Sequence, residues 1–199
     1  MSKLILASTS PYRRELLSRL GLTFDVRDAT VDESARPGEA PASLAQRLAR
    51  AKAENAAGTD SGDDEVIIGA DQVAARDGEL LRKPLDHDTA LSQLLACQGK
   101  IVQFHTATTV IVVGSGEKWH WLEDTEVEFL DLSNRQLDTY LRLEQPYDCA
   151  GGFKAEGLGI SLFKAIRSND PTALLGLPMI WLAQTLRDRG LDPLVSSTP

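Results

Sequence analysis

Two long strand patterns separated by only a few residues constrain the fold of this chain most. They cover residues 101–113 and 119–130, and Gly114-Ser115-Gly116 lies between them. Strand patterns joined by so short a glycine-containing connection predict an antiparallel hairpin. The sheet of this protein is therefore expected to contain antiparallel strands.

The N-terminal part of the chain instead alternates between strand and helix patterns. Residues 4–7 form a short apolar run, and Ser10-Pro11 is typical of an N-cap followed by proline at the first helical position. A helix pattern over residues 42–57 precedes a strongly apolar strand at 66–70. Composition does not shift enough to mark a linker. We therefore expect one mixed α/β domain over residues 1–199.

Charge and composition exclude several classes of protein. The chain has 21 Lys and Arg against 29 Asp and Glu, a net charge of −8, which argues against broad nucleic-acid binding. Two cysteines cannot by themselves make a disulfide framework or a four-ligand zinc site. No apolar run approaches the ~18 residues of a membrane span, and the run at 4–7 is too short for a signal peptide. We expect a cytoplasmic protein with neither nucleic acid nor membrane as partner.

The first strand-to-helix turn carries hydroxyls and two guanidiniums. Ser8, Ser10, Arg13 and Arg14 lie at a predicted helix N-terminus, where such groups favour anionic oxygens. The alternative is that Ser10 only caps the helix and both arginines are solvated, and spacing alone does not decide between the two. The turn has neither the P-loop nor the dinucleotide-binding glycine pattern.

Asp71 follows the apolar strand at 66–70, and ligands of α/β proteins bind beyond such strand ends. An aspartate there suits a metal ligand or a general base, but taken alone it is better explained as a loop residue bound by backbone N–H groups. Similarly, Glu33 taken alone suggests a solvated turn and Lys52 a surface lysine. Lys83 is less ordinary because Pro84 restricts its backbone. Together the two arginines and the two lysines suit a polyphosphate, and the carboxylates suit a divalent cation. Phosphoanhydride hydrolysis requires both kinds of group.

Several motifs, in order along the chain, resemble those of the Maf family of nucleoside triphosphate pyrophosphatases. They run from Leu6-Ala7-Ser8-Thr9-Ser10-Pro11-Tyr12-Arg13-Arg14 through Val31-Asp32-Glu33, Ala51-Lys52-Ala53, Gly69-Ala70-Asp71-Gln72 and Lys83-Pro84 to Ala150-Gly151-Gly152-Phe153. The resemblance implies an α/β fold shared with inosine triphosphate pyrophosphatases, with an elongated mixed sheet flanked by helices and two lobes around a cleft. It also implies hydrolysis of modified nucleotides to a monophosphate and pyrophosphate with a divalent metal, Mg²⁺ or Mn²⁺.

The resemblance also implies roles for individual residues. Asp71 matches the proton acceptor, and Glu33 matches an acidic position linked to catalysis or metal, so both are expected to help hold the cation. Polar cleft positions are matched by Ser8, Arg13, Arg14, Lys52 and Lys83. Of these, Arg13, Lys52 and Lys83 would neutralise the triphosphate.

Three further positions, Tyr12, Gln72 and Glu156, match those that set the specificity for the base. In the dTTP/UTP branch they look like Arg, Thr and Gln, whereas this trio resembles the 7-methyl-GTP branch. The first position is Tyr where close relatives often have Trp, so an aromatic ring is retained. Its face attracts the cationic 7-methylguanine by ~0.5–2 kcal/mol. A carboxylate at Glu156 accepts from the guanine N1–H and amine, and it repels the O2 or O4 of a pyrimidine.

We therefore expect a pyrophosphatase that converts 7-methyl-GTP to 7-methyl-GMP and pyrophosphate. One alternative is a dTTP/UTP pyrophosphatase, and another is a nucleotide-binding regulator of septum formation without turnover. The expected partner is a small-molecule nucleotide, and a homodimer is one assembly that the sequence allows.

Overall fold

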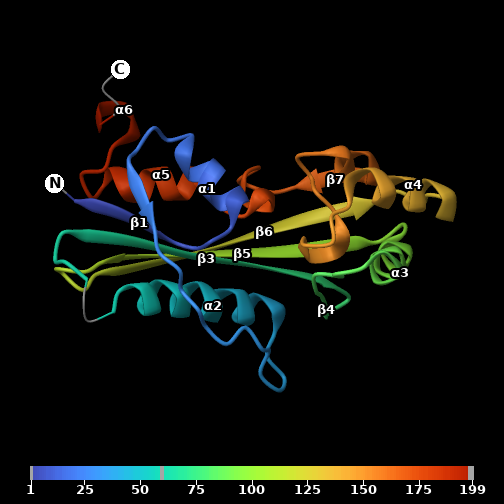
Figure 1. Ribbon diagram of the computed structural model, residues 1–199, viewed down its shortest axis with the longest axis horizontal. Coiled ribbons are helices and arrows are strands. Elements are labelled where there is room, and N and C mark those ends of the chain that lie inside the picture. The colour runs from blue at the N-terminus through green and yellow to red at the C-terminus, as the bar shows by residue number, and fades with distance from the viewer. Residues whose placement is uncertain (1, 59–60, 197–199) are drawn as a thin grey trace.

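The computed structural model describes residues 2–58 and 61–196. In this part of the chain, seven strands form one mixed sheet that runs the length of the molecule (Figure 1). Six of them follow the order β2-β1-β3-β5-β6-β7, and β4 pairs with β3 outside this path. Their bounds are β1 Lys3–Ala7, β2 Phe24–Val26, β3 Glu65–Arg76, β4 Glu79–Leu81, β5 Ile101–Val112, β6 Lys118–Phe129 and β7 Phe163–Arg167.

The sheet combines a parallel part and an antiparallel part. Strand β1 pairs in parallel with β2 and β3, as the strand and helix alternation of the N-terminal part predicts. Strands β5 and β6 form the predicted antiparallel hairpin, with Ile111 opposite Lys118 beside the connection. Strands β3, β5 and β6 have 12 residues each, which makes each about 40 Å long and the sheet elongated.

Helices cover both faces of the sheet. Helices α1 and α5 lie on one face and α2 on the other, while α3 and α4 lie toward the opposite end from the two chain termini (Figure 1). The helix bounds are α1 Pro11–Ser18, α2 Pro41–Ala56, α3 His87–Cys97, α4 Asn134–Glu144, α5 Met179–Arg187 and α6 Pro193–Ser196. The described residues also include the short 3-10 helices η1 Ala150–Gly152, η2 Leu158–Leu162 and η3 Ala173–Leu175.

The predicted N-cap is present at the start of α1. The Ser10 hydroxyl accepts from the Arg13 backbone N–H at 3.5 Å, and Pro11 is the first helical residue. The cap thus satisfies one of the N–H groups that a helix start leaves without an internal partner. The cap also fixes the start of the helix, and with it the positions of Tyr12 and Arg13 in the first turn.

Buried apolar side chains gather at both ends of the sheet. At the α3 and α4 end, Phe104, Phe129, Phe153 and Phe163 make edge-to-face contacts with ring centroids 4.8–5.6 Å apart. The other end is filled by apolar residues of β1, α1, β3 and α5. The structure confirms an elongated mixed sheet flanked by helices, while the division into two lobes around a cleft stays a prediction.

Strand β3 corrects the expected place of Asp71. The sequence predicted that this strand ends at residue 70, but β3 continues to Arg76 and Asp71 lies in its middle, opposite Ala107 of β5. The strand continues because β5 supplies hydrogen bonds along its whole length. Strand β1, on the other side, ends at Ala7 opposite Gly69. Asp71 therefore lies beyond the end of the neighbouring parallel strand and not beyond the end of its own.

None of the helices in the described part of the chain combines the length and the apolar character that crossing a membrane requires.

Candidate active site

A cavity of about 1050 Å³ lies beyond the carboxyl end of β1. This volume is at the upper end for small-molecule sites. Its walls come from the turn between β1 and α1, the loop after β2, helix α2, strands β3 and β4, and the segments around η1 and η3. Nine of the ten predicted site residues line it: Ser8, Tyr12, Arg13, Glu33, Lys52, Asp71, Gln72, Lys83 and Glu156. Arg14, the tenth, is exposed and is not among the lining residues.

Lys52 joins the two predicted catalytic carboxylates. Its Nζ lies 2.7 Å from Asp71 Oδ1 and 2.6 Å from Glu33 Oε1. The side chains of Lys52 and Asp71 are only 11% exposed, whereas that of Glu33 is 63% exposed. The sequence pattern favoured a surface lysine at position 52, and the structure shows that this was wrong. Its amino group is shielded from solvent, and the two carboxylates that accept from it offset the cost of burying this polar group.

Gly69 explains why Lys52 reaches Asp71. The backbone of α2 lies directly over Gly69, and a Cβ there would come within 2.5 Å of the Ala53 nitrogen. A strand glycine often marks such a close approach of another backbone. The next residue before Ala53 is Lys52, and two residues after Gly69 comes Asp71. The close contact therefore places the ammonium beside the carboxylate.

Glu33 is held in its ionised form by the surrounding cations. The hydrogen bond from Lys52 lowers the pKa of Glu33 below its ordinary value, although partial burial acts in the opposite direction. Lys83 and Arg13 lower it further through charge. Lys83 itself is exposed and makes no ion pair within the part of the chain that the structure describes. Its ammonium is thus available to an anionic ligand at this end of the cavity.

Arg13 is fixed by hydrogen bonds on two sides. Its Nε donates to the Gly176 carbonyl at 3.1 Å, and its Nη1 donates to the Ser8 hydroxyl at 3.3 Å. Burial lowers the pKa of Arg13, while the charges of Asp71 and Glu33 raise it; an arginine nevertheless remains a cation. The guanidinium is thereby held at a defined place in the cavity wall.

The segment around η3 is positioned by Asp170, which sequence reasoning missed, and by Gln72, for which it predicted a different role. Asp170, which is 3% exposed, accepts from the backbone N–H of Thr172 at 2.9 Å and of Ile180 at 2.7 Å. The Gln72 amide donates to the carbonyls of Ala173 and Leu174, at 3.0 and 3.1 Å. This segment supplies the Gly176 carbonyl that fixes Arg13. The one sequence signal for it was Asp170-Pro171, a typical turn dipeptide that says nothing of a distant arginine.

Tyr12 and Glu156 lie together at another part of the cavity. The Cys149 thiol is 3.8 Å from the Tyr12 hydroxyl, and partial burial raises the Tyr12 pKa, with a smaller contribution from the charge of Glu156. Burial also raises the pKa of Cys149 to about 11. Cys149 is half-buried and lines the cavity. Its raised pKa still keeps it from being a thiolate nucleophile at neutral pH.

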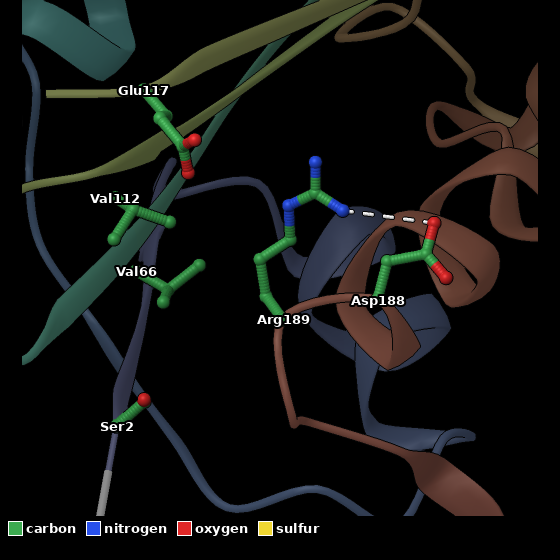
Figure 2. Close-up of a pocket in the computed structure, with 6 residues that line it drawn as sticks. All are labelled: Ser2, Val66, Val112, Glu117, Asp188 and Arg189. Atoms are coloured by element: carbon green, nitrogen blue, oxygen red, sulfur yellow. Dashed lines mark ion pairs between the residues drawn. The ribbon is translucent and has the colours of Figure 1, made fainter. Parts of the chain in front are cut away.

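A second cavity of about 410 Å³ shares none of its described lining residues with the first. Figure 2 shows its lining, which consists of Ser2, Val66, Val112, Glu117, Asp188 and Arg189. Arg189 projects into it, with its guanidinium 3.5 Å from the centre of the Trp119 ring and 3.6 Å from Asp188. This cation is thus already paired, and the described lining does not combine a base with several cations. The larger cavity is the candidate active site.

Comparison with known proteins agrees with this geometry. The family model described as "Maf-like protein" matches residues 3–189. A protein of Xanthomonas axonopodis pv. citri named 7-methyl-GTP pyrophosphatase is 54% identical over 192 residues, which cover 96% of this chain and 99% of the relative. Proteins of the same name from Methylobacillus flagellatus and Idiomarina loihiensis are 50% and 46% identical, over 96% of this chain and 99% and 96% of theirs. This chain belongs to the Maf family.

Proposed function

We propose that this protein is a nucleotide pyrophosphatase that hydrolyses 7-methyl-GTP to 7-methyl-GMP and pyrophosphate. The observation that carries the proposal is one cavity that holds Asp71, Lys52, Glu33 and Arg13 within direct or close electrostatic contact. Relatives of about 50% identity over nearly the whole chain carry the name of this activity.

Asp71 is proposed to take the proton from the attacking water. It is the more buried of the two carboxylates, and it lies on a rigid central strand of the sheet. Rigid support of this kind keeps a base in one geometry, which general-base catalysis requires. Lys52 fixes the carboxylate from the side of α2.

Arg13, Lys52 and Lys83 are proposed to neutralise the triphosphate. Positioned cations in a water-poor site stabilise the charge that develops in phosphoryl transfer. Arg13 is pre-oriented by Gly176 and Ser8, so little reorganisation is needed when the substrate binds. Arg14 has no part in this proposal because it is exposed and outside the cavity lining.

Glu33 and Asp71 fit a divalent cation such as Mg²⁺ or Mn²⁺. Within the described residues no group of three or more His, Cys, Asp or Glu side chains could hold a metal. Two carboxylates are nevertheless a sufficient protein contribution where substrate phosphates and water complete the coordination. The bound cation would supply neutralisation of phosphate charge. Both carboxylates already accept from Lys52, so that lysine would share them with the ion.

Tyr12 and Glu156 are proposed to recognise the base. The aromatic face suits a cationic purine, and the carboxylate suits the N1–H and amine of guanine. An arginine at position 12, typical of the dTTP/UTP branch, would repel the methylated base. Gln72 acts here through the η3 segment, because its amide is bound to two backbone carbonyls.

The proposal retains a single domain over residues 1–199 and a cytoplasmic location. It also retains two lobes, one at each end of the sheet, with the cavity as the cleft between them. Support for the lobes comes from the lining itself, which includes Phe104 and Phe153 of the α3 end as well as Ala7 of the β1 end. The expected partner is a small nucleotide.

A substrate panel tests the proposed function. The purified protein is incubated with 7-methyl-GTP, GTP, dTTP and UTP, with Mg²⁺ or Mn²⁺, and the products are identified by mass spectrometry. We expect 7-methyl-GMP and pyrophosphate, with the highest kcat/KM for 7-methyl-GTP. Preference for dTTP or UTP would place the chain in the other branch, and binding without product would indicate a regulator.

A further inference from the structure

Leu85 combines three features that are rarely found in one residue. Its backbone has a φ of +65°, in the left-handed region that large L-residues avoid. The residue is 77% exposed although it is large and apolar. It also lines the candidate active-site cavity. A strained and exposed leucine at a binding site suggests a contact that the protein alone does not make.

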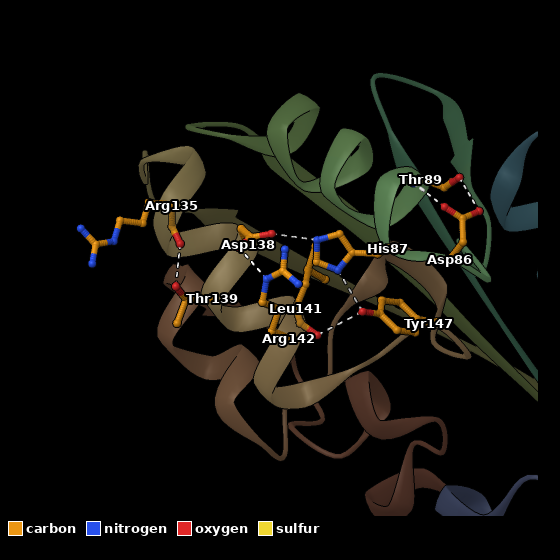
Figure 3. A network of polar contacts seen from close by, with 9 residues as sticks. All are labelled: Asp86, His87, Thr89, Arg135, Asp138, Thr139, Leu141, Arg142 and Tyr147. Atoms are coloured by element: carbon orange, nitrogen blue, oxygen red, sulfur yellow. Dashed lines mark hydrogen bonds and ion pairs between the residues drawn. The ribbon is translucent and has the colours of Figure 1, made fainter.

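The surrounding structure holds the Leu85 backbone in this conformation. Its N–H donates to the Tyr147 carbonyl at 3.0 Å, and Pro84 before it is buried. Directly after it, Asp86 caps α3 by accepting from the Thr89 N–H at 2.8 Å. His87 Nδ1 lies 3.0 Å from the Tyr147 hydroxyl, so Tyr147 is tied to this segment through both its backbone and its side chain (Figure 3). The side chain of Leu85 is therefore presented from a clamped backbone.

Packing within the protein does not explain the leucine. An apolar residue just before a helix N-cap often packs against the fourth helical residue, which is Ala90 in α3. Ala90 is fully buried, but Leu85 is 77% exposed and so is not covered by such a contact. The fold thus accepts backbone strain without gaining buried apolar area from this side chain.

The position of Leu85 indicates which part of a ligand it meets. The Leu85 N–H is hydrogen-bonded to the carbonyl of Tyr147, which comes two residues before Cys149 in the chain. The Cys149 thiol in turn contacts the Tyr12 hydroxyl. Lys83, two residues earlier in the chain, acts by its charge on Glu33. The segment 83–85 therefore runs from the carboxylate and cation group toward the part of the cavity that holds Tyr12.

We infer that Leu85 is a substrate-binding residue whose side chain covers an apolar face of the bound nucleoside. The inference rests on the proposed function, since it takes a nucleotide as the ligand. Burial of a leucine side chain against a ligand ring stabilises the complex by the hydrophobic effect. The clamped backbone keeps the side chain in place before binding, which lowers the entropic cost of association.

The test compares Leu85→Asn and Leu85→Met with wild type. Asparagine tolerates a left-handed backbone, so Leu85→Asn removes the apolar side chain without adding strain. Methionine keeps the apolar character. Two control variants lie outside the cavity lining: Gln145→Asn changes another residue with positive φ, at +49°, and Leu143→Asn removes a leucine that is 71% exposed.

Kinetics and inhibition then distinguish an effect on the nucleoside, probed by 7-methyl-GMP, from an effect on the phosphates, probed by inorganic tripolyphosphate. For Leu85→Asn we expect the KM for 7-methyl-GTP and the Ki for 7-methyl-GMP to rise about fivefold to thirtyfold, equivalent to about 1–2 kcal/mol. The kcat, the thermal midpoint and the Ki for inorganic tripolyphosphate should stay at wild-type values. Leu85→Met and both controls should keep wild-type KM values.

Three results would overturn the inference. An unchanged KM and Ki in Leu85→Asn, with active wild-type protein, refutes it and leaves the proposed function intact. Equal rises for 7-methyl-GMP and tripolyphosphate would mean a general distortion of the cavity. If wild type neither hydrolyses 7-methyl-GTP nor binds 7-methyl-GMP in a calorimeter, the proposed function and this inference both fail.

Discussion

Replacing Asp71 by asparagine removes the proposed base with the smallest change in shape. The amide oxygen of the variant can still accept from Lys52, whose Nζ lies 2.7 Å from Asp71 Oδ1, and Lys52 keeps its second partner, Glu33, at 2.6 Å. The change therefore replaces the ion pair between Lys52 and Asp71 by a hydrogen bond from the same ammonium to a neutral amide oxygen. We expect this to lower the free energy of unfolding by about 1 kcal/mol.

The expected effect of Asp71→Asn on catalysis is much larger. Loss of a general base typically costs ~10²–10⁴-fold in rate, which corresponds to about 3–5 kcal/mol in the activation barrier. If Asp71 is a base, the increase in the activation barrier should exceed the decrease in the free energy of unfolding. If it is only a structural carboxylate, it should not. Pyrophosphate release gives kcat and KM, and urea unfolding gives the stability.

A matched control for Asp71→Asn is Asp77→Asn. Asp77 lies in the turn after the same strand, is exposed, and is outside the cavity lining. It should retain wild-type kcat. Near-wild-type turnover in folded Asp71→Asn would remove Asp71 from the mechanism. A loss of activity that only follows a loss of folding would make Asp71 a structural partner of Lys52.

Three further predictions concern other parts of the molecule. Arg13→Ala should lower kcat/KM by about 10²–10³-fold, while the loss of two hydrogen bonds lowers stability by only about 1–2 kcal/mol; a catalytic loss no larger than the stability loss would refute the role of this cation. Glu156→Gln should reduce the preference for 7-methyl-GTP over UTP about tenfold to a hundredfold, measured as the ratio of kcat/KM values; an unchanged ratio would make Glu156 an ordinary loop residue. The hydrogen bond from Arg27 lowers the pKa of Glu65 below its ordinary value of 4.5, so the ionised carboxylate stabilises the fold above that pH, and this stabilisation is lost as the pH falls through the folded-state pKa. Urea unfolding between pH 7 and 3 should therefore show that the difference in unfolding free energy between wild type and Glu65→Gln shrinks as the pH falls. A difference that stays constant with pH would contradict this role of Glu65.

Local features of the fold were predictable from the sequence because they depend on neighbouring residues. The cap at Ser10 and the hairpin between residues 112 and 118 each need only a few consecutive side chains of suitable type. The apolar run at 66–70 correctly predicted a buried strand, but not its continuation to Arg76. That continuation depends on β5, which lies more than 20 residues later and supplies the hydrogen bonds.

The site itself divides in the same way. Residue types and family motifs named Asp71, Glu33 and Lys52, and the structure brings them into contact. Helical periodicity predicted a surface position for Lys52 because the pattern describes one helix alone. It contains no information about the strand that packs against that helix. The glycine at position 69 carried a signal for that close approach, since a glycine inside an apolar strand marks a backbone neighbour.

The sequence was sufficient to predict the strands at 4–7 and 66–70, the hairpin of β5 and β6 and the cap at Ser10, because each depends on neighbouring residues. It also named nine of the residues that line the larger cavity. The packing of distant segments, in contrast, leaves Arg14 exposed and outside the cavity lining, fixes Arg13 through Gly176, and holds Leu85 in a left-handed conformation beside Tyr147. These outcomes depend on hydrogen bonds between segments 60 or more residues apart, as from Arg13 to Gly176 and from Leu85 to Tyr147. Propensity and periodicity act over a few residues, so they carry no information about such partners.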